Sequence, residues 1–96
     1  EAFRGFRGVL RGKIVEVGGY EVLLRAEEIT SLDDANTASD ANSIKGKLVR
    51  ISGFYDGHAD KFNELQPSDI IRVSVRHANP IFDMFGVTDV LEIVEQ

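Results

Sequence analysis

An alternation of apolar and polar side chains with a period of two residues is the feature that most constrains the fold of this chain. Between residues 20 and 27, Tyr20, Val22, Leu24 and Ala26 alternate with Glu21, Leu23, Arg25 and Glu27. Successive side chains of a β-strand point to opposite faces of a sheet, so this pattern predicts a strand with one buried and one largely polar face. Similar runs cover residues 9–17, 47–55, 71–76 and 87–94, and no convincing amphipathic helix pattern occurs between them. The sequence therefore predicts an all-β protein of five strands.

The glycines indicate how these strands are arranged. Gly18-Gly19 separates the first two runs and predicts a tight hairpin, which makes those strands antiparallel neighbours. Gly12 and Gly53 lie inside predicted strands, where glycine marks bends and bulges that let a sheet coil and close. We therefore expect a five-stranded antiparallel, partly open barrel of the oligonucleotide/oligosaccharide-binding (OB) type. A small SH3-like barrel or a small sandwich is the alternative.

A chain of 96 residues is expected to form one domain. We assign residues 1–7 to an N-terminal lead and residues 8–96 to a single barrel. The apolar positions of the predicted strands should form its core: Val15, Val22, Leu24, Val49, Ile51, Ile71, Val73, Val75 and Leu91.

The stretch from residue 30 to residue 43 interrupts the strand pattern. It is rich in Ser, Asn, Asp and Ala, and it carries Asp33, Asp34 and Asp40 without any basic residue. This composition predicts a long acidic surface loop. A short helix capped by Ser31, with Leu32 packing inward, is the alternative.

Several phrases of the sequence resemble OB-fold barrels over roughly residues 6–95. The stretch from Leu65 to Val73, Leu-Gln-Pro-Ser-Asp-Ile-Ile-Arg-Val, is similar to a Leu-x-Pro-Gly-Asp-x-Val-x-Val phrase that launches a barrel strand in that superfamily. Gly12-Lys-Ile-Val-Glu16, the turn into Tyr20-Glu-Val-Leu-Leu24, and Gly46-Lys-Leu-Val-Arg-Ile51 follow the same rhythm. Phe6-Arg-Gly8 followed by Gly12-Lys13 also resembles uncharacterised bacterial OB-like modules of exported or repeat-rich proteins. The resemblance implies a barrel without a catalytic signature, and it favours an exported or cell-envelope protein over a cytoplasmic one.

The chain departs from that superfamily pattern at three places. Ser68 stands where the turn glycine is expected, so we predict a turn conformation that tolerates a Cβ. Residues 56–67 leave little room for the helix that commonly bridges the third and fourth strands. Phe54-Tyr55 ends the third strand where the bacterial modules would have a tryptophan.

Charge and composition lower the ranking of several function classes. The chain has 11 Lys and Arg against 16 Asp and Glu, and its net charge of −5 argues against a dedicated duplex-DNA binder. The absence of cysteine excludes disulfides and thiolate metal sites. No run of about 18 apolar residues predicts a membrane span.

Metal and catalytic motifs are weak. Asp56-Gly-His-Ala-Asp60 has too few ligands for zinc and is better explained as a turn. The acidic loop does not fit a calcium loop either, because the sixth and twelfth positions counted from Asp34 are Ser39 and Lys45. Motifs for a serine nucleophile, a phosphate loop or a zinc protease are missing. We expect no enzyme activity, no metal and no cofactor.

Candidate binding residues fall into three groups. Arg25 and Arg50 are expected on the outward face of the second and third strands, with Tyr55 at the rim. Arg72 and Arg76 are expected on the outward row of the fourth strand. Phe82 and Phe85 belong to an apolar cluster at residues 80–87, which either caps the barrel or forms a docking patch.

The N-terminal lead adds an arginine–aromatic pattern. Phe3-Arg-Gly and Phe6-Arg-Gly combine rings with guanidinium groups, which single-stranded nucleic acid requires for stacking and phosphate contacts. The simpler interpretation is that both rings pack against the barrel. We therefore predict a non-catalytic binding or interaction module, part of a larger or processed bacterial protein, with a protein partner or self-association favoured. A single-stranded nucleic-acid-binding OB domain is the alternative.

Overall fold

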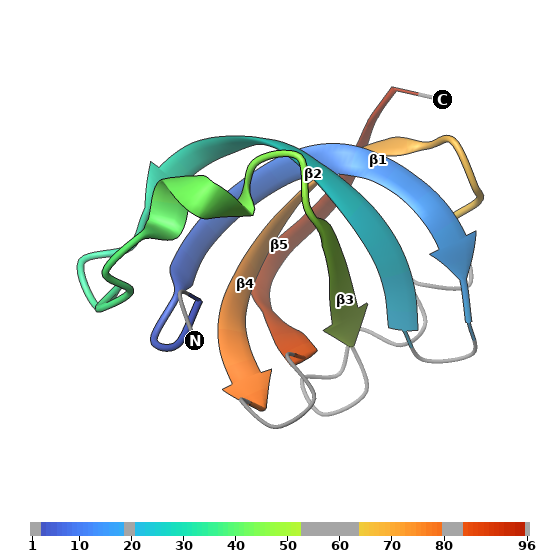
Figure 1. Ribbon diagram of the computed structural model, residues 1–96. Helices are drawn as coiled ribbons and strands as arrows, with labels where there is room; N and C mark the ends of the chain where they lie inside the picture. Colours follow the sequence, from blue (N-terminus) through green and yellow to red (C-terminus); the bar gives the residue numbers. More distant parts are fainter. Residues whose placement is uncertain (1–2, 19–20, 53–63, 80–83, 96) are drawn as a thin grey trace.

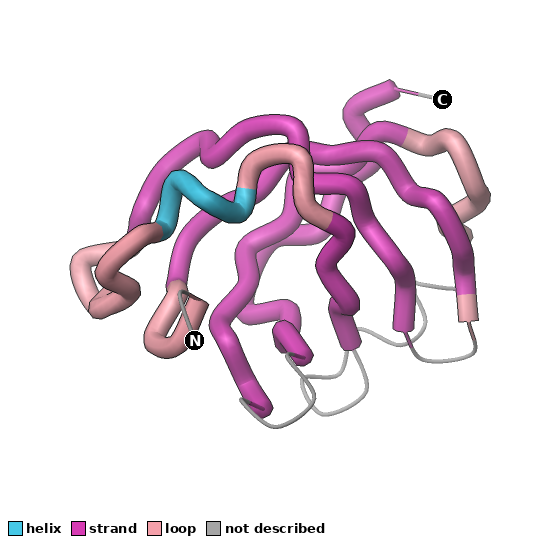
Figure 2. The backbone as a smooth tube through the Cα atoms, viewed as in Figure 1, coloured by secondary structure: helices cyan, strands magenta, loops and turns pink. Residues whose placement is uncertain are grey.

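The computed structural model describes residues 3–18, 21–52, 64–79 and 84–95 (Figure 1). These residues form five strands and one short 3₁₀ helix: β1 (Arg7–Val17), β2 (Glu21–Leu32), η1 (Ala41–Ile44), β3 (Leu48–Ser52), β4 (Ile70–Asn79) and β5 (Met84–Glu95). Strands dominate the backbone, and η1 is the one helical turn of the described chain (Figure 2). The all-β prediction is confirmed.

The strand pairings form a ring in the order β1-β2-β3-β5-β4, with β4 pairing back to β1. Four of these pairs are antiparallel, but β3 and β5 run parallel, with Arg50 to Ser52 opposite Met84 to Gly86. The expectation of a wholly antiparallel sheet is therefore wrong, and the sheet is mixed. The reason is geometric, because strand direction cannot alternate all the way around a closed ring with an odd number of strands.

Most of the predicted core is confirmed. Buried positions that the alternation predicted are Val22, Leu24, Val49, Ile51, Ile71, Val73 and Val75. The side chain of Leu91 lies outside the described part. The structure adds large buried side chains that the prediction omitted: Phe6, Leu10, Ile14, Ile44, Leu65, Phe85 and Val87. Phe3 also packs against this core, so the interpretation that the two rings of the lead pack inward is confirmed.

The assignment of Val15 to the core is wrong, since its side chain is 40% exposed. The inward row of β1 consists of Gly8, Leu10, Gly12 and Ile14, and its two glycines hide the alternation in the sequence. Between Ile14 and Glu16 the register with β2 shifts, which leaves Val15 as the extra residue of a β-bulge. Val15 follows inward-facing Ile14 in the alternation, so its side chain points to the outside of the ring.

Close backbone approach explains why glycine occupies this inward row. A Cβ at Gly12 would overlap the carbonyl oxygen of Arg25 on β2, and a Cβ at Gly8 would lie 2.6 Å from that of Ser31. The register between β1 and β2 also shifts beside Gly12. The prediction that Gly12 marks an irregularity in its strand is confirmed.

The segment from residue 30 to 43 differs from both sequence-based expectations at its start. Strand β2 continues to Leu32, so Ser31 does not cap a helix, and Leu32 is 46% exposed instead of packing inward. The short helical turn comes later, at η1, where Ala41 and Ile44 insert into the core. The stretch between β2 and η1 is a loop, as its composition predicted.

The turn before β4 corrects the expectation about Ser68. The amide of Asp69 donates to the carbonyl of Gln66 over 3.1 Å, and Ser68 has a φ of 79°. With Pro67 before it, this is the arrangement of a type II turn, whose third residue is normally glycine. Ser68 therefore adopts the left-handed conformation that glycine normally takes in this turn. The expected change to a turn conformation that tolerates its Cβ does not occur.

Candidate binding surfaces

The first candidate surface, here named the β1–β2–β3 face, is formed by outward side chains of those strands. Leu23 lies opposite Arg50, and Arg25 lies opposite Leu48. Directly opposed residues of an antiparallel pair share a face, and diagonal neighbours remain within reach of long side chains. Leu23 and Leu48 are therefore diagonal neighbours. The bulge places Val15 beside Leu23, so an apolar centre forms across the strands.

This apolar centre is accessible. Leu48 is 47% exposed, Val15 is 40% exposed, and Leu23 is half-buried. Leu23 and Leu48 occupy rows that the alternation predicted to be polar. Two apolar residues in outward rows were the sequence signal for this centre, and the candidate residues proposed from sequence did not include them.

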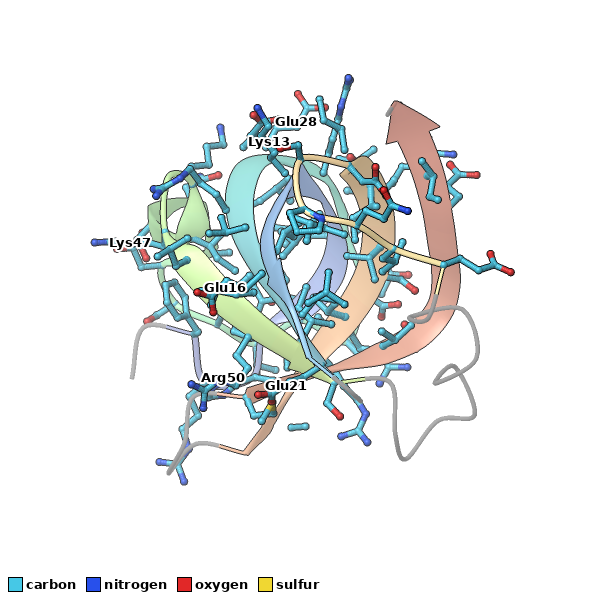
Figure 3. The ribbon with its side chains drawn as sticks, turned by 90° about the vertical axis from the view of Figure 1, so that its right-hand side faces the viewer. Lys13, Glu16, Glu21, Glu28, Lys47 and Arg50 are labelled. Carbon is cyan, nitrogen blue, oxygen red and sulfur yellow. The ribbon has the colours of Figure 1, made fainter. Side chains whose placement is uncertain are left out.

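Charged side chains surround the centre. The cations are Lys13, Arg25, Lys47 and Arg50, and the carboxylates are Glu16 and Glu21. In Figure 3 the side chains of Lys13 and Lys47 point away from the ring, and Arg50 lies beside Glu21. Glu28 on β2 also lies beside Lys13 (Figure 3), so cations outnumber carboxylates around the apolar centre by four to three, although the whole chain is acidic.

The two arginines of this face are anchored differently. Arg50 Nε lies 3.8 Å from Glu21 Oε1, with both side chains about half exposed. Arg25 Nη1 donates a hydrogen bond of 3.2 Å to the carbonyl oxygen of Gly46. A shallow pocket of about 140 Å³ beside Arg50 and Glu21 is smaller than the ~300 Å³ at which ligand pockets begin. The surface thus has the shape of a contact face rather than of a small-molecule site.

The second candidate surface, here named the arginine face, lies across β1 and β4. Arg7 is opposite Arg76, and Arg11 is opposite Arg72. Like charges directly opposite one another destabilise a sheet unless something compensates them. This pairing joins the arginines of the N-terminal lead and of β4 in one surface, which sequence spacing alone does not reveal.

Carboxylates compensate most of the arginine face. Arg72 forms an ion pair with Glu92 on β5, and Arg7 Nε lies 3.7 Å from Asp33 Oδ2. Arg11 is in register with Glu28 of β2 on its other side. Arg76 differs, because its opposite residue on β5 is Gly86 and no carboxylate of the described chain forms an ion pair with it.

Hydroxyl groups occupy the space between the two arginine rows. Thr88 Oγ1 donates a hydrogen bond of 2.8 Å to Oγ of Ser74, whose side chain is buried. Both residues line a pocket of about 150 Å³. The other residues that line it are Arg7, Gly8, Val9, Ser31 and Asp33.

The structure separates the candidate residues proposed from sequence. Arg25 and Arg50 share the β1–β2–β3 face, whereas Arg72 and Arg76 belong to the arginine face. Phe85 is fully buried, with ring centroids 5.9 Å from Phe6 and 5.0 Å from His77. Phe85 and Val87 thus form part of the core and are no docking patch. Tyr55 and Phe82 lie outside the described residues.

The described part of the chain holds neither a metal-ligating cluster nor a membrane-spanning helix. Residues 3–18, 21–52, 64–79 and 84–95 contain no group of three or more His, Asp or Glu side chains that could hold a metal ion. The Asp56–Asp60 stretch lies outside these ranges. Within the same ranges no helix has the length and apolar character needed to cross a membrane.

Comparison with protein-family models, with curated proteins and with solved structures finds no significant match to this chain.

Proposed function

We propose that this protein is a non-catalytic interaction module built on an OB-type barrel, and that its β1–β2–β3 face binds a partner protein. The ring order supports the OB-type assignment, because β1 pairs with both β2 and β4 and the fifth strand inserts between the third and the fourth. This is the connectivity of a five-stranded Greek-key barrel, whose ligand face crosses the second and third strands. The apolar centre lies on that side of the ring.

The observation that carries the proposal is the apolar centre of Val15, Leu23 and Leu48 inside a charged rim. Protein interfaces have this anatomy, with an apolar core that excludes water and a polar rim that sets orientation. Since cations outnumber carboxylates in the rim, charge complementarity favours an acidic partner. The fitting ligand is a protein segment that presents an apolar side chain flanked by carboxylates.

A single-stranded nucleic acid is the less favoured ligand for this face. Nucleic-acid grooves of OB-type barrels gain ~1–3 kcal/mol per base from stacking on aromatic rings. The outward rows of β2 and β3 in the described chain carry aliphatic and charged side chains and no ring. An aliphatic centre suits a protein side chain better than a base.

Selection of peptides on the purified protein tests the proposal. A phage-displayed library of random peptides should yield ligands in which an apolar residue is flanked by Asp or Glu. Leu48→Asp should abolish binding of these peptides, because it puts a carboxylate in the apolar centre. Val94→Asp is the matched control, since Val94 is 45% exposed on β5, away from this face, and should leave binding intact.

Two results would contradict the proposal. If the selected peptides bind the Leu48→Asp variant as tightly as the wild type, the apolar centre takes no part in recognition. A labelled single-stranded oligonucleotide that binds tightly, weakens steeply with salt and is lost in Leu48→Asp would instead support the nucleic-acid alternative.

A further inference from the structure

We propose that the arginine face holds a second site, between β1, β4 and β5, that binds the phosphate group of a ligand. The pocket lining supplies Arg7 and the hydroxyls of Ser74 and Thr88, and Arg76, which is not part of that lining, lies opposite Arg7 on β4. It is separate from the β1–β2–β3 face and does not depend on the function proposed for that face.

The arrangement of charge is the first argument. Arg7 and Arg76 lie opposite one another on antiparallel strands, a pairing that costs stability in the absence of a counterion. The neighbouring pair of Arg11 and Arg72 is flanked on both sides by carboxylates, Glu28 and Glu92. The Arg7–Arg76 pair has a carboxylate on one side alone, Asp33, and Gly86 on the other. One positive charge of this pair is therefore left without a carboxylate.

The ion pair between Asp33 and Arg7 is long. Asp33 Oδ2 lies 3.7 Å from Arg7 Nε, beyond the ~2.7–2.9 Å of a charge-assisted hydrogen bond. Its Oδ1 accepts a hydrogen bond of 2.8 Å from the amide of Ala35. Asp33 is thus engaged by its own turn, and it orients Arg7 without neutralising it tightly. A dianionic phosphate can compete for the guanidinium.

The pocket provides the second argument. Ser74 and Thr88 place a hydrogen-bonded hydroxyl pair beside Arg7, and Arg76 follows Ser74 two residues along the same face of β4. A volume of about 150 Å³ accommodates one tetrahedral anion and excludes a whole nucleotide. Gly86, opposite Arg76, adds no side chain that would cover the guanidinium. Arginine with neighbouring hydroxyl donors is the usual chemistry of phosphate recognition.

Backbone-amide NMR titration of the full chain with inorganic phosphate tests the site. Saturable shifts should appear at Gly8, Ser74, Arg76 and Thr88. Arg76→Gln should weaken phosphate binding by about tenfold, the loss expected for one charge-assisted hydrogen bond. Lys45→Gln, which removes one exposed cation outside both faces, is the matched control and should leave binding unchanged. A dispersed spectrum of each variant establishes that it is folded.

Two further probes identify the source of the phosphate. A single-stranded oligothymidylate that shifts the same amides at lower concentration than inorganic phosphate identifies a nucleic-acid backbone. If the oligonucleotide binds no more tightly than inorganic phosphate, the site takes a single phosphate group. The proposal is overturned if phosphate causes no saturable shifts, if Arg76→Gln and Lys45→Gln behave alike, or if a polyglutamate peptide shifts the same amides equally well.

Discussion

The β1–β2–β3 face and the arginine face share strand β1, yet their side chains are arranged in opposite ways. On the first, an apolar centre at Leu23 and Leu48 is surrounded by charges. On the second, a hydroxyl pair at Ser74 and Thr88 lies between two rows of arginines. The inward row of β1 is apolar or glycine throughout and supports both faces. The outward rows do not fill the core, and their side chains give the two faces their different chemistry.

The largest expected effect is a loss of stability that disrupts both faces, because they share strand β1. Gly12→Ala should destabilise the protein by about 3 kcal/mol or more, because its Cβ would overlap the backbone of β2 and force the strands apart. Gly46→Ala is the control, since a Cβ there meets nothing within 4 Å and the cost is the left-handed φ of 81° alone, roughly 1 kcal/mol. Urea denaturation measures both. Equal losses would refute the close approach of β1 and β2.

A pair of adjacent substitutions distinguishes the inside of the ring from the β1–β2–β3 face. Ile14→Ala should cost about 2–5 kcal/mol, because Ile14 is 2% exposed in the core. Val15→Ala should change stability by less than about 0.5 kcal/mol, because Val15 follows inward Ile14 in the strand and is exposed on the outside of the ring. Thermal denaturation compares them. If Val15→Ala proved the more costly change, the assignment of Ile14 to the inside and Val15 to the outside of the ring would be wrong.

A third substitution should raise the stability of the ring and leave both faces unchanged. Ser68→Gly is expected to raise stability by about 0.5–1 kcal/mol, because glycine adopts a φ of 79° without the steric cost that serine bears. The same change at Ser43, in η1, should lower stability, since it removes a hydrogen bond of 2.8 Å to the Asp40 carbonyl. Chemical denaturation provides the test. A loss of stability in Ser68→Gly would exclude the strained turn.

The smallest expected effect is the coupling free energy of one ion pair on each face. Double-mutant cycles on Arg72–Glu92 and on Arg50–Glu21 should each give a coupling of about 0.2–1 kcal/mol, as for other half-exposed pairs. The Arg72 pair should be the stronger, because Arg50 Nε is 3.8 Å from its partner oxygen. Both couplings should fall as salt is added. A stronger Arg50 pair would contradict the charge arrangement of the two faces.

Sequence reasoning succeeded where alternation was unbroken and failed where backbone geometry intervened. The inward rows at Val22 and Leu24 and at Val73 and Val75 were predicted because each strand keeps its period of two. The inward row of β1 was missed because glycines occupy it. Without that row the phase of β1 was assigned one residue off, which placed Val15 in the core.

Pairings between distant strands also escape sequence reasoning. The meeting of Arg7 with Arg76 depends on how the ring closes, and the spacing of residues along one strand does not encode that closure. Leu23 and Leu48 are apolar residues in outward rows, which the sequence shows, but their proximity is a property of the β2–β3 register. The two faces could therefore be identified only from the fold, whereas most of the core was predicted from the sequence.

The most direct test of the account asks whether the two faces act as separate sites on one ring. NMR titrations with phosphate should be run in the absence and in the presence of a saturating peptide selected on the β1–β2–β3 face. If the two sites are separate, peptide shifts should appear at the amides of β2 and β3, phosphate shifts at Gly8, Ser74 and Thr88, and the phosphate Kd should be unchanged. Competition between the two ligands, or shifts at the same amides, would contradict this separation.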